Sequence, residues 1–184
     1  MLNISIKKLY FCALMFICII IAHILTIIYL AYLSPNKTYQ HLSNKYKLHR
    51  FSEIQNNEKS LKGKNSFFHY YICPFNVRHK TLCVTVKNNG AYFWALAFYN
   101  SKGNLVYSLN NHLMHHKDLN LIMGEPMELA LLKKYYNKED LASYIIVPRN
   151  IEKGITILKI YANSMNEMKQ AQALAQNARC APLM

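Results

Sequence analysis

One apolar stretch divides the chain, LYFCALMFICIIIAHILTIIYLAYL at residues 9–33. It contains no formally charged residue, and His23 and Thr26 are its main polar interruptions. A helix of this length, at about 1.5 Å per residue, crosses roughly 30 Å of hydrocarbon with some tilt. We therefore expect a transmembrane helix over 9–33, preceded by a short cytoplasmic N-terminus at 1–8.

The basic pair Lys7 and Lys8 precedes the span, as it would in a signal peptide. The apolar run is longer than the usual signal-peptide core of about 7–15 residues, and its exit lacks a small-x-small cleavage site. We expect an uncleaved signal anchor, with a processed signal peptide as the alternative, and a C-terminal body on the far side of the membrane from the cytoplasm. The basic residues after the span favour the opposite orientation by count, which leaves a cytoplasmic body as the alternative.

The rest of the chain is basic, and this limits its partners. Lys and Arg number 22 against 9 Asp and Glu, which gives a net charge of +13. Such a charge attracts anionic lipid, an envelope polymer or nucleic acid, although A/T-rich codons produce the same composition. We expect the lipid bilayer as one partner, and another envelope protein or an anionic envelope polymer as a second. Nucleic acid becomes a partner only if the body faces the cytoplasm, since no nucleic-acid-binding motif is present.

The residues after the span form a polar, basic connector at 34–66, followed by a soluble domain at 67–184. Within that domain, 67–73 is aromatic, 81–87 alternates between apolar and polar residues, and 91–99 is apolar on both faces. These patterns are typical of β-strands. A further strand follows with Leu105, Tyr107 and Leu109 on its inward face, and Asn88-Asn89-Gly90 predicts a hairpin between the second and third strands.

The remaining third of the chain mixes helices and strands. A helix is expected from about Pro126 to Tyr136, with acidic residues early and basic residues late. Two strands at 144–147 and 155–161 are expected to pair with each other. A capping box at Ser164 to Glu167 predicts a final helix to about Ala178. The fold class is therefore mainly β, with one or two peripheral helices, preceded by a single transmembrane helix.

The aromatic strand and its surroundings resemble a known bacterial membrane-protein family. The resemblance rests on six positions and their neighbours: Cys73, Trp94, Tyr99, Gly103, Leu109 and Asn110. In this pattern the chain is similar to the domain-of-unknown-function family numbered twelve fifty-four, although Asn76, Asn100 and Asn111 stand where Asp is usual. The resemblance implies a mostly β, sandwich-like domain of antiparallel sheets on one membrane span, without an established activity. It also implies a bacterial inner (cytoplasmic) membrane as the location, with the C-terminal domain in the periplasm.

The chain carries no HExxH, G-x-S-x-G, phosphate-binding glycine loop or paired CxxC motif. The candidate metal ligands are His112, His115, His116 and Asp118, although their spacing matches no familiar site. The first hypothesis is accordingly a non-catalytic binding or structural domain of the cell envelope that needs no cofactor. The alternative is a metal-dependent enzyme or factor that uses the His112–Asp118 loop.

Three of the five cysteines lie in the body, namely Cys73, Cys83 and Cys180. In an oxidising compartment Cys73 and Cys180 are our candidates for a disulfide, which would tie the end of the chain to the first strand of the body. Cys73 with Cys83 is the competing pair. Three reduced thiols are the expectation for a cytoplasmic body.

Overall fold

The computed structural model describes residues 6–33, 35–54, 67–87, 92–114 and 118–183, which fall into two compact units. The first unit contains helix α1 (Ile6–Leu33). Within α1, Lys8–Leu30 is long and apolar enough to cross a membrane, and none of it is buried against protein. By length and composition, this helix is compatible with a single-pass anchor.

The second unit is a sandwich of two β-sheets, which confirms the predicted fold class. Sheet A has five strands, in the spatial order β1 (Ser52–Glu53), β2 (Phe68–Asn76), β8 (Lys153–Tyr161), β4 (Trp94–Asn100), β5 (Leu105–Asn110). Sheet B has four, in the order β7 (Ile145–Pro148), β6 (Leu119–Gly124), β3 (Thr81–Val86), β9 (Arg179–Leu183). All described pairs are antiparallel except β6 with β7.

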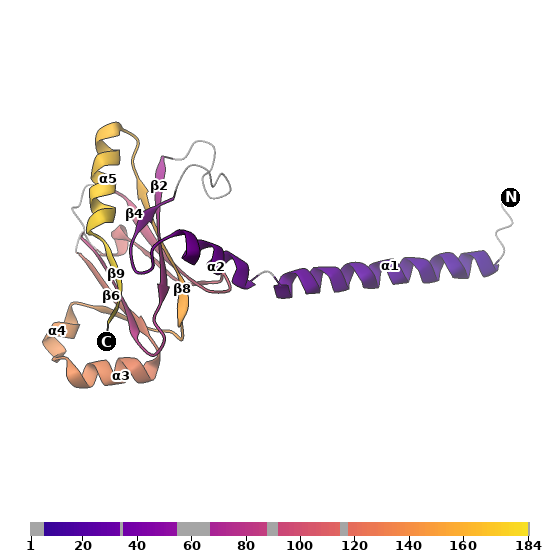
Figure 1. Ribbon diagram of the computed structural model, residues 1–184, viewed down its shortest axis with the longest axis horizontal. Helices are drawn as coiled ribbons and strands as arrows, with labels where there is room; N and C mark the ends of the chain where they lie inside the picture. Colours follow the sequence, from indigo (N-terminus) through magenta and orange to yellow (C-terminus); the bar gives the residue numbers. More distant parts are fainter. Residues whose placement is uncertain (1–5, 34, 55–66, 88–91, 115–117, 184) are drawn as a thin grey trace. The chain divides into compact units, whose positions relative to one another are not determined.

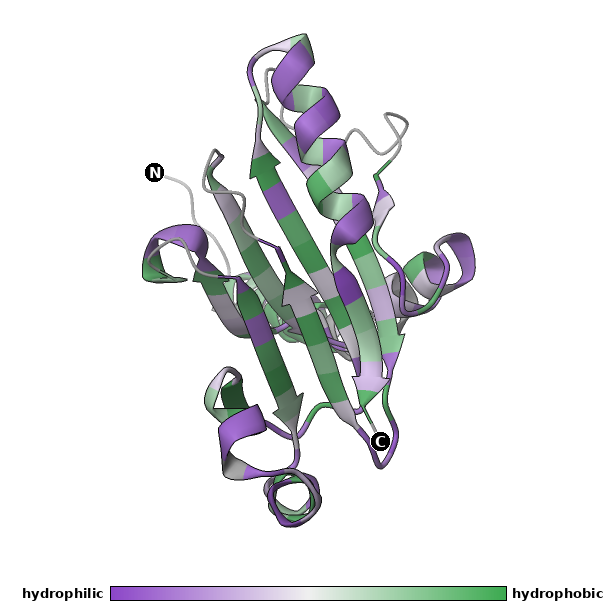
Figure 2. Ribbon diagram, turned by 90° about the vertical axis from the view of Figure 1, so that its left-hand side faces the viewer, coloured by the Kyte–Doolittle hydropathy of each residue, from purple (hydrophilic) through white to green (hydrophobic). Residues whose placement is uncertain are grey.

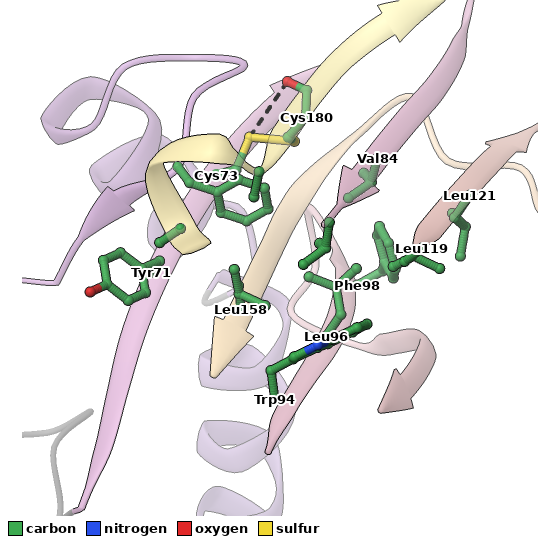
Figure 3. Packing of buried hydrophobic residues seen from close by; sticks show 14 of the residues in the cluster. Tyr71, Cys73, Val84, Trp94, Leu96, Phe98, Leu119, Leu121, Leu158 and Cys180 are labelled. Atoms are coloured by element: carbon green, nitrogen blue, oxygen red, sulfur yellow. Dashed lines mark hydrogen bonds between the residues drawn. A yellow bond between two sulfur atoms is a disulfide. The ribbon is translucent and has the colours of Figure 1, made fainter. Parts of the chain in front are cut away.

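The core lies between the sheets because each strand presents alternate residues inward. On β3 the buried apolar residues are Leu82, Val84 and Val86, as the alternation predicts, and Thr81 at the start of the strand is buried as well. On β4 they are Trp94, Leu96 and Phe98, all without solvent exposure. Figure 3 shows Val84, Trp94, Leu96 and Phe98 in one cluster with Leu119 and Leu121 of β6 and Leu158 of β8. Figure 2 shows the same alternation as bands of hydrophobic and hydrophilic residues along the strands.

Helices close the two ends of the sandwich (Figure 1). α5 (Met165–Asn177) lies at one end, and half of the predicted capping box is present, since Ser164 Oγ accepts a hydrogen bond from Glu167 N. Glu167 Oε2 accepts from Asn163 N at 2.8 Å, one residue before the predicted donor. α3 (Pro126–Tyr135) and α4 (Lys138–Ala142) lie at the other end. A short 3₁₀ helix (Asn111–Met114) follows β5.

The predicted connector at 34–66 is in part a structural element of the body. α2 (Pro35–Lys45) occupies its first residues, and the compact body begins at Thr38 rather than at residue 67. Leu42, Tyr46 and Ile54 are buried against the outer face of sheet A. Polar composition concealed this packing because only every third or fourth residue is apolar. Residues 55–66, expected as loop, lie outside the described residues.

Two predicted strand pairings are wrong. β3 and β4 belong to different sheets, so the hairpin predicted between them is not formed. Residues 88–91, which include the predicted Asn88-Asn89-Gly90 turn, lie outside the described residues. β7 and β8 also belong to different sheets: β8 is the centre of sheet A, between β2 and β4. Strands that are adjacent in sequence therefore lie in opposite sheets here, and each sheet buries its apolar face against the other.

β5 departs from its predicted inward face at one position. Leu109 is buried, but Leu105 is 56% exposed. A shift of register between Phe98 and Tyr99 inserts an extra residue opposite β4, which turns Leu105 away from the core. The final strand, β9, was not predicted from the sequence. It is five residues long and ends at the chain's penultimate residue.

Candidate functional site

The structure describes two of the four predicted metal ligands, His112 and Asp118. His112 is exposed in the 3₁₀ helix, with its ring centroid 5.8 Å from that of Phe93. Asp118 precedes β6, while His115 and His116 lie outside the described residues. Among the described residues, no group of three or more His, Cys, Asp or Glu side chains is arranged to hold a metal ion. A metal site in this loop stays a prediction.

Asn100, where the family pattern has Asp, organises the turn between β4 and β5. Its Oδ1 accepts hydrogen bonds from Lys102 N at 3.0 Å and from Asn104 N at 2.9 Å. Gly103, at φ +81°, completes the turn, where a side chain would be strained. Since the turn uses only the side-chain acceptor, a carboxylate would serve equally well at position 100.

The buried Asn111 has a different requirement. Its Nδ2 donates to Tyr92 O at 2.7 Å, and its Oδ1 accepts from Trp94 N at 3.4 Å. The amide therefore supplies both a donor and an acceptor that hold the first residue of the 3₁₀ helix to the start of β4. An Asp at this position would lack the donor, so Asn is the better residue for this contact.

Two more residues of the family pattern are structural. Trp94 is completely buried, and its Nε1 has no hydrogen-bond partner in the described chain. Asn110 Oδ1 accepts from Leu113 N at 3.2 Å and begins the 3₁₀ helix. Stacking of a ligand on Trp94 would require an exposed ring face, and the ring is completely buried.

Cys73 and Cys180 form a disulfide that joins β2 of sheet A to β9 of sheet B. Their Cα atoms are 6.7 Å apart, and both side chains are buried (Figure 3). Cys83 is a free thiol on the outer face of sheet B. Burial raises the pKa of this thiol, because desolvation disfavours the thiolate.

The outer face of sheet A carries an open groove of about 500 Å³, which we call the sheet A groove. Ala95 and Ala97 of β4 form its floor, where small side chains leave the backbone accessible. Its walls come from neighbouring strands: Tyr70, Tyr99, Ser108, Asn110, Ile157 and Lys159. One cross-strand row holds Tyr70, Lys159, Ala95 and Asn110 in register. The sequence predicted that 91–99 is covered on both faces, whereas this face is only half-buried.

Aromatic rings hold Lys159 in position at the groove. Its Nζ lies 3.8 Å from the ring centroid of Phe68 and 5.7 Å from that of Tyr70. Such cation–π contacts attract the ammonium group to the ring faces and so fix its position. The groove thus combines an apolar floor with one oriented cation and the polar groups of Ser108 and Asn110.

The sheet A groove ends at an unprotected edge strand, β5. Edge strands of natural sheets are blocked by charge, proline or short length. The other three edges follow this rule: β1 has two residues, β7 ends in Pro148, and β9 contains Arg179 and Pro182. β5 has six residues, reads LVYSLN, and contains neither charge nor proline. Its register shift lies at Leu105 and Val106, so Tyr107–Asn110 is the regular part of this edge. In the described chain it pairs only with β4.

Comparison with known proteins shows a fold relationship alone. No protein-family model and no curated protein matches the chain. Its fold is similar to that of the VPA0106 protein from Vibrio parahaemolyticus, at 15% identity and a TM-score of 0.58, over 83% of this chain and 37% of that chain. An uncharacterized protein from Burkholderia cenocepacia is 11% identical with a TM-score of 0.45, over 79% and 36% of the two chains. The chain thus spans little more than a third of these structures.

Fold and span together define the class: a β-sandwich protein with one N-terminal apolar helix of membrane-spanning length. The likeness to the Vibrio structure supports the sandwich and adds no activity. The resemblance to the family numbered twelve fifty-four stays a prediction from the sequence. The sheet A groove was not predicted from the sequence, because its residues come from four strands. The alternating Ala95 and Ala97 are the local sequence signal that could have indicated it.

Proposed function

We propose that this chain is a single-pass protein of a bacterial inner membrane, whose periplasmic body binds an extended segment of another envelope protein. The segment adds to the β5 edge and places its side chains in the sheet A groove. The observation that carries this proposal is β5 itself, an edge strand without charge or proline beside an open groove.

The chemistry of the edge supports a peptide ligand. An extended peptide that pairs with an exposed strand gains main-chain hydrogen bonds, and pockets beside the strand select its alternate side chains. Ser108 and Asn110 lie on the groove side of β5, while Ala95 and Ala97 leave room for side chains above β4. Lys159 adds a preference for an acidic residue in the ligand.

The disulfide supports a periplasmic body. Disulfides persist in oxidising compartments, and glutathione and thioredoxin keep most cytosolic thiols reduced. Cys73 and Cys180 are paired across the two sheets. The exported orientation is tested by fusing the C-terminus to alkaline phosphatase and, separately, to a green fluorescent protein. Phosphatase activity without fluorescence is expected, and fluorescence without phosphatase activity contradicts the proposal.

The binding surface is tested by photocrosslinking in cells. A benzophenone amino acid at Ser108, exposed on β5, is expected to give a crosslinked product with another envelope protein. The matched control is the same amino acid at Met127, which is 75% exposed on α3 at the end of the body. No product at Ser108, or the same products from both sites, contradicts the proposal. A crosslinked product that contains two copies of this chain would show that the β5 edge binds a second copy of the chain and not a different envelope protein.

A further inference from the structure

A second groove lies beside α5, where basic side chains gather, and we call it the basic groove. Its volume is about 480 Å³, and polar surface predominates in its lining. The principal polar side chains come from segments distant in sequence: Lys45, Lys47, Arg50, Tyr71, Gln172 and Gln176. Glu53 also lines the groove, so three cations face one carboxylate.

Packing holds the basic segment in place. Tyr46, Phe51 and Ile54 are each at most 8% exposed and fix this part of the chain to the body. Between them, His49 adopts φ 60° and its N donates to Pro74 O at 2.9 Å. This left-handed turn leaves Lys47 and Arg50 exposed at the groove. The cations are therefore carried by an ordered segment rather than by a solvated tether.

The groove retains its positive charge and adds neutral donors. In the part of the chain that the structure describes, Lys47 and Arg50 form no ion pair with an acidic side chain. Glu53 Oε1 lies 3.8 Å from His69 Nδ1, a group outside the groove. Burial and the charge of Glu53 raise the pKa of Tyr71 to about 12, so its phenol keeps its proton. The Tyr71 oxygen points away from the labelled core residues in Figure 3.

Phosphate is the anion that this set of donors fits. Arg and Lys supply charge-assisted hydrogen bonds to phosphate oxygens, and the amides of Gln172 and Gln176 supply neutral ones. The groove is also close to the span in sequence, because Lys45 follows Leu33 by twelve positions. Basic residues next to a membrane span are attracted to anionic lipid.

We propose that the basic groove binds the phosphate of an anionic phospholipid head group. The inference requires that α1 is anchored in a membrane, as proposed above, but neither the orientation of the body nor the β5 site. It adds a lipid ligand at a site separate from the sheet A groove.

The test uses the full chain in nanodiscs of phosphatidylcholine, with and without phosphatidylglycerol. Co-elution of the protein with phosphatidylcholine discs in gel filtration shows whether α1 anchors the protein. A failure of the anchor is therefore distinguished from a failure of head-group binding. Acetylation of Lys47 by a water-soluble reagent is then measured by mass spectrometry. Lys133, exposed on α3 at the end of the body away from α5, is the internal control. Phosphatidylglycerol is expected to protect Lys47 and not Lys133.

The variant Arg50→Gln keeps Lys47 as the reporter and removes one cation from the groove. The phosphatidylglycerol fraction that gives half-maximal protection is expected to rise about fivefold, which is the value of one basic residue near an anionic surface. Arg149→Gln, which removes an exposed arginine after β7, is the matched control and is expected to change nothing.

Three results would overturn the inference. Equal acetylation of Lys47 in both kinds of disc would show that no head group binds. Equal effects of Arg50→Gln and Arg149→Gln would show general attraction to the surface rather than a groove. Protection of Lys47 by inorganic phosphate in phosphatidylcholine discs, with no further protection from phosphatidylglycerol, would assign the groove to a free anion.

Discussion

The disulfide between Cys73 and Cys180 gives the sharpest stability prediction. It closes a loop with a sequence separation of 107 residues and joins the two sheets. In the chain-entropy treatment, a cross-link over about 100 residues restricts the unfolded chain by about 4.7 kcal/mol. The double variant Cys73→Ala/Cys180→Ala is therefore expected to lose up to about 4.7 kcal/mol of unfolding free energy.

The assay is urea unfolding of the full chain in detergent micelles, followed by tryptophan fluorescence. Trp94 is the only tryptophan and is fully buried, so its emission reports the core directly. With a slope of about 2 kcal/mol/M, the predicted loss lowers the urea midpoint by about 2 M. Reduction of the wild-type protein should produce a shift of the same size.

Cys83→Ala is the matched control, because Cys83 is a half-buried free thiol that closes no loop. Its midpoint is expected to stay close to that of the wild type. The reasoning is refuted if the double variant unfolds at the wild-type midpoint. It is also refuted if Cys83→Ala and the double variant are destabilised equally, since the competing pair Cys73–Cys83 would then be in use.

Three further changes test other parts of the fold. Gly154→Ala is expected to lower the free energy of unfolding by about 1–3 kcal/mol. A Cβ at this position would collide with the carbonyl oxygen of Tyr99 and lie 2.7 Å from Phe75 Cζ. An unchanged urea midpoint would contradict this prediction. The pKa of Tyr71 is raised to about 12, so the protonated phenol stabilises the fold below pH 10, and this stabilisation is lost as the pH rises towards 12. Tyr71→Phe should therefore lose less stability than the wild type between pH 10 and 12, and parallel pH profiles of the two proteins would contradict this prediction. Cys83, whose thiol pKa is raised by burial, should be alkylated more slowly at neutral pH than in the unfolded chain, and equal rates by site-resolved mass spectrometry would disprove this.

Local patterns in the sequence were sufficient for several elements. The alternation at Leu82, Val84 and Val86 identifies the buried face of β3, because side chains of a strand point to opposite faces in turn. The predicted cap at Ser164 marks the start of α5, since its side chain satisfies the backbone N–H of Glu167 in the first turn. Each signal is complete within a few residues.

Strand pairing required information that no local pattern contains. β8 was expected beside β7, yet it pairs with β2 and β4, whose residues lie more than fifty positions earlier. β9 has Pro182 and only five residues, so it becomes a strand through its pairing with β3. The neighbour of a strand depends on which faces must be buried together, a property of the whole domain.

The candidate sites divide in the same way. The sequence by itself determined the apolar span at 9–33, the mainly β class, the basic character, and Cys73 with Cys180 among the alternative cysteine pairs. Only the tertiary structure decided that four strands form the sheet A groove, that β5 is an unprotected edge, and that Lys47 and Arg50 meet α5 in the basic groove. The physical reason is range: hydrophobic periodicity and capping act over neighbouring residues, whereas a groove exists only where distant segments pack side by side.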